Sequence, residues 1–242
     1  MNILIVNDDG WGAKGLMTLL PHILPLGKVM VVVPDGPRSG MSNAVTATHP
    51  ISLHKVEQEG FDLYLTNGTP SDCVKLAINV LFKGDAQAID LVVSGINHGS
   101  NASINLIYSG TMGACFVAAE HNIPAIGFSI DDMSDNPDFS YMEPYLGQLI
   151  EHLMDEGLQH KCYNINAPKG AIQGIRWTRQ SKSHWTDEMA PIRMENGETA
   201  YKLAGYMVND EPEATDTDLW ALEHGYISIQ PCKVDMTDYG AL

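Results

Sequence analysis

Two adjacent carboxylates stand almost at the N-terminus, between a short apolar run and a glycine, in the stretch MNILIVNDDG. Like charges on Asp8 and Asp9 repel each other and raise the pKa of one of them, a cost that a divalent cation beside them removes. The structural alternative is a helix cap followed by a first-turn acid, but one aspartate is sufficient for a cap and leaves the second without a role. The pair therefore favours a divalent-cation site.

Further oxygen-bearing side chains follow other apolar runs. The stretches PDGPRSGMSNAVT, SGINHGSN and YSGT are rich in Asp, Asn, Ser and Gly and contain no cysteine and no histidine pair at zinc spacing. Hard oxygen ligands of this kind select magnesium, manganese or calcium. Taken singly, Ser39 is typical of a turn serine and Asn97 is equally typical of an Asx turn. His98, beside them, is either a general acid or a solvent-facing loop residue.

The stretch YSGT directly precedes an apolar, helix-like segment. Free backbone amides and the positive end of the helix dipole bind phosphate at such a position. A serine or threonine N-cap explains the same residues equally well, so the residues alone leave both interpretations open.

Short apolar segments alternate with helical patterns along most of the chain, and they must position these polar stretches. Strands are predicted at residues 2–6, 28–33, 89–94, 124–129 and 162–168, and helices over 13–24, from Thr69, from Ser109 and near 141–157, with Pro21 bending or shortening the first helix. Strand followed by helix, repeated, indicates an α/β protein with a doubly wound parallel sheet. Ligands bind at the carboxyl ends of such strands, where we expect the polar stretches to gather.

The pattern changes after about residue 165. The segments 174–185, 199–208 and 225–231 are strand-like, with few helices between them. We therefore expect a catalytic domain over residues 1–165 and a smaller β-rich appendage over 166–242, packed as one compact unit.

Composition excludes several classes of partner. The 242 residues carry a formal net charge of −16, which repels a nucleic-acid duplex or an anionic membrane, so an anionic substrate must meet a local positive field. The four cysteines lie far apart without a C-x-x-C pair, which favours a reducing cytoplasm. No basic leader and no run of about 18 apolar residues is found, so we expect a cytoplasmic protein without a membrane anchor.

Seven stretches follow one another in a fixed order: ILIVNDDG, VVVPDGPRSGMSNAVT, NGTPSDCVKLAINVL, DLVVSGINHGSN, YSGTMGACFVAAEHNIPAIGFS, NINAP and GYISIQP. This order resembles the SurE survival-protein family of metal-dependent nucleotidases. The resemblance implies a Rossmann-like domain and a β-rich part that exchanges a hairpin with a partner subunit, in a homodimer or homotetramer. It also implies hydrolysis of nucleoside 5′-monophosphates, with 3′-monophosphates left open, by attack of a water activated by the metal.

The resemblance further implies which residues form the site. One divalent ion, Mg²⁺ or Mn²⁺, would be bound by Asp8, Asp9, Ser39 and Asn97, of which Asp8, Asp9 and Asn97 would be catalytic. The substrate-facing positions would be Ser42, Asn43, Asn101, Ser109, Gly110 and Thr111.

The chain departs from the family in places, and other functions compete. The loop NASINLIYSGT, with Ser103 and Asn105, and the stretch YKLAGY leave the shape of that loop, the base preference and the oligomer contacts open. Adjacent aspartates do not form the D-x-D of aspartyl-phosphate phosphatases, and no G-x-S-x-G indicates an α/β-hydrolase. A non-enzymatic nucleotide- or metal-binding regulatory protein would use the same ligands and stays an alternative.

Overall fold

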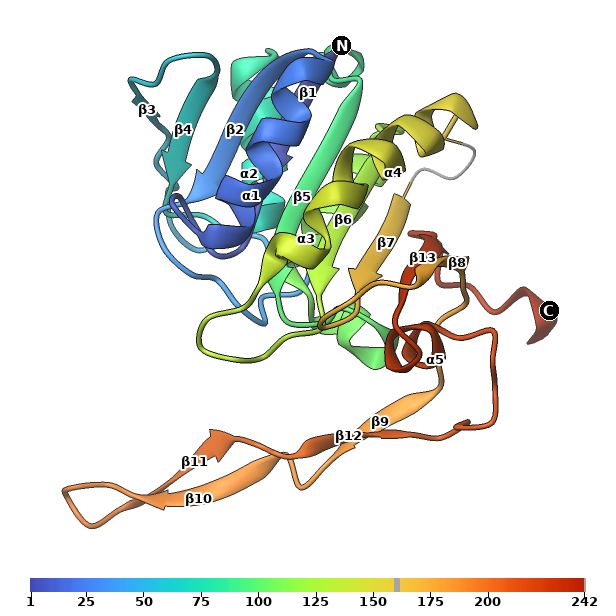
Figure 1. Cartoon of the computed structure of the whole chain (residues 1–242). Coiled ribbons are helices and arrows are strands. Elements are labelled where there is room, and N and C mark those ends of the chain that lie inside the picture. The colour runs from blue at the N-terminus through green and yellow to red at the C-terminus, as the bar shows by residue number, and fades with distance from the viewer. Residues whose placement is uncertain (159–161, 242) are drawn as a thin grey trace.

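The computed structural model describes residues 1–158 and 162–241. Its central sheet is built from β1 (Asn2–Val6), β2 (Lys28–Pro34), β3 (His54–Val56), β4 (Asp62–Thr66), β5 (Leu91–His98), β6 (Ala125–Ile130), β7 (Cys162–Ala167), β8 (Gly174–Trp177) and β13 (Tyr226–Cys232). The nine strands lie in the order β3-β4-β2-β1-β5-β6-β7-β13-β8 (Figure 1). From β4 to β7 they run parallel, whereas β3 and β13 are antiparallel to β4 and β7.

Helices cover both faces of this sheet. They are α1 (Lys14–Ile23), α2 (Pro70–Leu76), α3 (Gly110–Glu120), α4 (Glu143–Asp155) and α5 (Asp218–Glu223), with shorter turns η1 (Leu24–Leu26), η2 (Ala77–Leu81), η3 (Ala86–Ala88), η4 (Ser103–Tyr108), η5 (Phe139–Tyr141) and η6 (Tyr239–Ala241). Along β1, Ile3 and Ile5 pack with α1 and α4, whereas Leu4 and Val6 pack with α2 and α3. Burial on both faces explains why the strands are apolar throughout and confirms the predicted α/β sheet.

The predicted helix starts are confirmed by their caps. The Thr69 hydroxyl accepts the Asp72 N–H, and the Asp72 carboxylate accepts the Thr69 N–H, which closes a capping box at α2. The Ser109 hydroxyl accepts the Met112 N–H at the start of α3. Pro21 lies inside α1, which ends two residues later and continues as the tighter turn η1.

Two expectations about strands need correction. Strand β5 does not end at residue 94 but continues to His98 after a shift of register between Ser94 and Asn97, so Asn97 lies within the strand instead of in a loop after it. The run 174–185 is not one strand, because the Ser181 backbone N–H and hydroxyl turn aside to the Asp218 carboxylate at 2.9 and 2.6 Å. The short strands β3 and β4 were not predicted.

The C-terminal part is β-rich, as predicted, but it is divided between the sheet and a projection. Strands β8 and β13 extend the central sheet. Strands β9 (Ser183–Thr186), β10 (Met189–Arg193), β11 (Thr199–Leu203) and β12 (Tyr206–Asn209) form the antiparallel pairs β9·β12 and β10·β11. Figure 1 shows these pairs as an arm, residues 183–209, that projects beyond the carboxyl ends of β5, β6 and β7.

No helix within residues 1–158 and 162–241 is both long and apolar enough to span a bilayer.

The contact between α1 and β5 gives a stability prediction. A Cβ at Gly15 would lie 2.0 Å from the carbonyl oxygen of Ile96, a backbone atom that cannot move without the strand. We expect Gly15→Ala to lower the free energy of unfolding by about 1–3 kcal/mol through overpacking, measured by urea denaturation. The matched control is Gly147→Ala in α4, where a Cβ meets no described atom within 4 Å and the helix should gain about 0.5–1 kcal/mol. Equal unfolding midpoints for the two variants would contradict this packing.

Candidate active site

Strand β1 carries the aspartate pair to the carboxyl edge of the sheet. Immediately after the strand, the Asn7 side chain closes a turn by donating to the Gly10 carbonyl at 2.8 Å and accepting the Gly10 N–H at 3.1 Å. Gly10 has a φ of +89°, and a Cβ there would lie 3.2 Å from the Pro34 carbonyl oxygen. A glycine is therefore needed for β1 to turn here beside the end of β2.

Asp8 is the buried member of the pair, with 4% of its surface exposed. Its carboxylate accepts a hydrogen bond of 2.7 Å from the Thr111 hydroxyl. Burial, and then the charge of Asp9, raises the pKa of Asp8 to about 7, although the Thr111 hydrogen bond acts in the opposite direction. The site therefore holds a carboxylate whose charge is not fully compensated by the described residues.

Asp9 is half-buried beside His98, at the end of β5. Burial raises the pKa of Asp9, while the hydrogen bond from the His98 backbone and the His98 ring counteract this rise. Asp9 and the exposed His98 line a cavity of about 280 Å³ together with Lys14, whose ammonium group donates to Asn136 and to the Pro137 carbonyl. The location of His98 fits either of its predicted roles, as a general acid or as a solvent-facing residue.

The N-terminus of α3 lies directly against Asp8. A Cβ at Gly110 would be 3.1 Å from the Asp8 Cβ and 3.2 Å from its Oδ2, so a side chain there would have to displace the Asp8 carboxylate slightly. The Ser109 hydroxyl caps the helix, and the Thr111 hydroxyl donates to the Asp8 carboxylate. The second hydrogen bond holds this end of the helix beside the aspartate pair. The partial positive charge of a helix N-terminus favours an anion here.

The loop after β2 approaches the same place. The Arg38 backbone N–H donates to the Asp8 carbonyl at 2.6 Å, and the Ser42 backbone N–H donates to the Tyr108 carbonyl at 3.0 Å. Ser42 and the exposed Asn43 lie beside the first turn of α3, because a Cβ at Gly113 would lie 2.3 Å from the Ser42 carbonyl oxygen and 3.1 Å from Asn43 Oδ1. Ser39 is exposed, and within the described chain no hydrogen bond joins it to either carboxylate.

Asn97 lies at the end of β5, and Asn101 lies in the segment that follows it. The Asn97 amide group donates to the Gly99 carbonyl at 2.7 Å, so its side-chain oxygen stays available as a ligand. Asn101 is buried, with 5% exposed, and its amide group donates to the Ser129 hydroxyl at 2.6 Å. The structure thus places Asn101 behind the site surface, and its predicted contact with substrate stays a prediction.

The two asparagines of NINAP have a role that the sequence alone did not reveal. Asn164 and Asn166 are fully buried on β7 and bonded to each other at 3.0 Å. Asn166 accepts the Asn101 N–H at 2.8 Å and Asn164 donates to the Asn101 carbonyl at 2.8 Å. They fix the segment that follows Asn97. Two polar residues in alternate positions of a buried strand were the available signal, since buried amides need partners.

The donor chemistry of this site fits a divalent cation. Within residues 1–158 and 162–241, no group of three or more His, Cys, Asp or Glu side chains is arranged to bind a metal, so a cation would depend on the aspartate pair and neutral oxygens. Burial of two adjacent carboxylates, with the pKa of Asp8 raised to about 7, is the electrostatic condition that a cation relieves. The predicted ligands Asp8, Asp9, Ser39 and Asn97 all offer oxygen donors, and their joint binding of one cation stays a prediction.

Fold and site together define a class of protein: an α/β protein with an aspartate pair and a helix N-terminus meeting at the carboxyl edge of its sheet. The family model described as "Survival protein SurE" matches residues 3–187. A "5'-nucleotidase SurE" of Phocaeicola vulgatus is 41% identical over 99% of this chain and 93% of its own, and one of Flavobacterium psychrophilum is 42% identical over 99% and 94%. The crystal structure of the SurE protein from Aquifex aeolicus superposes with a TM-score of 0.84 at 31% identity, covering 100% of this chain and 97% of that one. The chain belongs to the SurE family.

The raised pKa of Asp8 predicts a pH-dependent stability. The folded chain binds a proton more tightly at Asp8 than the unfolded chain does, so stability is lost as pH rises from the ordinary value of 3.8 through about 7. In EDTA, we expect the wild-type free energy of unfolding to fall between pH 4 and pH 8 by an amount on the order of 4 kcal/mol more than that of Asp8→Asn. Urea denaturation across this range measures the difference, and parallel curves for the two proteins would contradict the burial of a charged Asp8.

Proposed function

We propose that the chain is a divalent-metal-dependent phosphatase of nucleoside 5′-monophosphates, with 3′-monophosphates as a further substrate. The observation that carries the proposal is the buried Asp8, next to the half-buried Asp9 and against the N-terminus of α3, which brings a cation-binding group and an anion-binding group together. The name 5'-nucleotidase of the relatives supports the same reaction. One Mg²⁺ or Mn²⁺, when bound, supplies charge neutralisation and lowers the pKa of a water molecule.

The residues of the chain then have separate tasks. The backbone amides at the start of α3, including that of Thr111, and the Ser109 hydroxyl bind the nonbridging phosphate oxygens. Thr111 also holds the Asp8 carboxylate in place through its 2.7 Å hydrogen bond. Ser42 and Asn43 border the phosphate from the loop after β2. Together they provide the local positive field that a chain with net charge −16 needs for an anionic substrate.

Steady phosphate release is the measurement that tests this proposal. Purified protein with Mg²⁺ or Mn²⁺ should release phosphate from nucleoside monophosphates over many turnovers, and EDTA should abolish the release because the proposed ligands are all hard oxygen donors. Binding of the nucleotide without turnover would favour the alternative, a nucleotide- or metal-binding regulatory protein. Full turnover in EDTA would contradict the metal dependence.

Two variants separate charge from position in the proposed metal site. Asp9→Asn keeps the shape but removes one of two formal charges, so it should need far more Mn²⁺ to reach half activity. Asn97→Ala removes a neutral ligand that water replaces, so its metal requirement should stay near normal while its plateau rate falls by about 100-fold through misplacement. Both are measured with one nucleotide. An unchanged rate and metal requirement in Asp9→Asn would make Asp9 merely a helix-capping acid.

We further propose that residues 166–242, packed against the catalytic residues 1–165, serve oligomerisation in a homodimer or homotetramer. Apolar side chains are exposed along the arm: Met189 at 62%, Ile192 at 43% and Tyr201 at 67%. Light scattering should give the mass of at least a dimer. Tyr201→Asp should lower the measured mass of the assembly, whereas Val80→Asp, at an exposed residue outside the arm, should leave it unchanged. A monomeric wild-type chain would contradict the proposal.

The four free, buried cysteines support a cytoplasmic location.

A further inference from the structure

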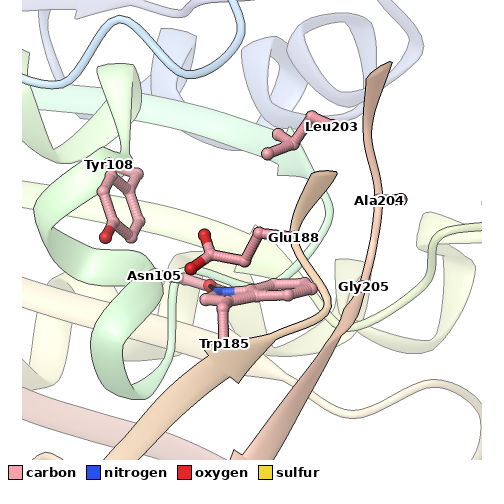
Figure 2. A pocket seen from close by; sticks show the side chains of 7 residues that line it. All are labelled: Asn105, Tyr108, Trp185, Glu188, Leu203, Ala204 and Gly205. Carbon is pink, nitrogen blue, oxygen red and sulfur yellow. Dashed lines mark hydrogen bonds between the residues drawn. The ribbon is translucent and has the colours of Figure 1, made fainter. Parts of the chain in front are cut away.

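A cavity of about 400 Å³ opens between the η4 turn and the base of the arm (Figure 2). Asn105 and Tyr108 line it from η4, and Trp185, Glu188 and the turn at 203–205 line it from the arm. Its volume lies within the roughly 300–1,000 Å³ of small-molecule sites. None of these residues belongs to the proposed metal and phosphate site.

The cavity nevertheless lies next in the chain to the end of α3 that we propose to bind phosphate. Tyr108 immediately precedes Ser109, the cap of α3, and consecutive Cα atoms are only about 3.8 Å apart. The Ser42 backbone N–H donates to the Tyr108 carbonyl at 3.0 Å, so the loop that borders the phosphate also fixes the Tyr108 backbone. In Figure 1 the base of the arm lies beyond the carboxyl ends of β5, β6 and β7, the edge where the aspartate pair lies. A substrate whose phosphate lies on α3 therefore has this cavity as its neighbour.

Two aromatic side chains form walls of the cavity. The Tyr108 side chain is exposed, with 49% of the residue accessible. Trp185 is half-buried, and its indole N–H donates to the Asn105 side-chain oxygen at 2.9 Å, which fixes the ring at the wall of the cavity (Figure 2). Flat ring faces of this kind stack on nucleobases with little dependence on base identity.

The Glu188 carboxylate decides which part of a ligand the cavity can accept. Figure 2 shows the Glu188 carboxylate pointing into the space between Tyr108 and Trp185, and no hydrogen bond or ion pair joins it to another described residue. An ionised carboxylate only accepts hydrogen bonds, so a ligand must present N–H or O–H groups to it. The same charge repels a phosphate. The cavity is thus suited to the end of a nucleotide that lies away from its phosphate.

We propose that this cavity binds the nucleoside part of the substrate, with the base stacked on Tyr108 and Trp185 and with N–H or O–H donors of the base or ribose bonded to Glu188. The proposal rests on the proposed phosphatase function, since it extends the same substrate beyond its phosphate. It predicts that the chain hydrolyses nucleotides in preference to phosphomonoesters that have no base.

The test compares a nucleotide with a phosphomonoester that has no base. In Tyr108→Ala, the ratio of kcat/KM for a nucleoside 5′-monophosphate to kcat/KM for glycerol 2-phosphate should fall about 10-fold, because only the nucleotide loses a stacking partner. Tyr141→Ala, an equally exposed tyrosine on η5 away from this cavity, is the matched control and should keep the wild-type ratio. An unchanged ratio in Tyr108→Ala would overturn the proposal, as would an equal loss on both substrates.

Glu188→Gln tests whether the hydrogen bond to the carboxylate comes from the ribose or from the base. The variant should lower kcat/KM about 5-fold for substrates that bond the carboxylate, with Glu195→Gln in the arm turn as the control. A loss for ribonucleotides but not for 2′-deoxynucleotides assigns the bond to the ribose, and an equal loss for both, dependent on the base, assigns it to the base. No loss for any nucleotide would overturn the role of Glu188.

Binding of a free nucleoside separates this inference from the phosphatase proposal. Adenosine should change the tryptophan fluorescence saturably in the wild type, and the change should disappear in Trp185→Phe. If no substrate releases phosphate but this signal is present, the phosphatase proposal fails and the nucleoside site stands. If phosphate is released but adenosine gives no signal and does not compete, the nucleoside site is overturned.

Discussion

The burial of the Asp8 carboxylate next to a second, half-buried carboxylate is the constraint on which the other features of this molecule depend. Helices pack on both faces of strand β1, so its interior has no room for charged side chains. Asp8 and Asp9 therefore lie just after the strand, at the carboxyl edge of the sheet. There Asp8 is almost fully buried, and its pKa of about 7 shows that the Thr111 hydroxyl offsets only part of the cost of burial and of the charge on Asp9. A fold that keeps such a pair needs positive charge from elsewhere.

Much of the surrounding structure holds that pair and the groups facing it. Gly10 and Gly110 allow the turn after β1 and the start of α3 to approach the pair closely, and neither position tolerates a side chain without displacement. On the other side, Asn164 and Asn166 hold the Asn101 backbone from β7, which fixes the end of β5 and with it Asn97. Fully bonded buried amides specify one arrangement of a loop, because any other leaves polar atoms without partners.

The sequence predicts the parts of this fold that depend on local physics. Apolar runs predict the parallel strands β1, β2, β5, β6 and β7, although not β4, and the Thr69 and Ser109 caps predict the starts of α2 and α3, because both signals act within a few residues. The extension of β5 through Asn97 and the burial of Asn101 depend on pairing with β6 and β7, which no local pattern encodes. The same holds for the arm and its cavity, whose walls come from segments about 80 residues apart in the chain.

The most direct test of the central claim is the proton balance of metal binding. Mn²⁺ titrated into the protein by calorimetry, in buffers of different ionisation enthalpy at pH 7, should bind at one site per chain with release of a fraction of a proton, because Asp8 with a pKa of about 7 must ionise fully. The release should disappear above about pH 8 and in Asp8→Asn. Tight binding without proton release at pH 7, or binding that is unaffected in Asp8→Asn, would contradict the claim that a cation relieves the buried aspartate pair.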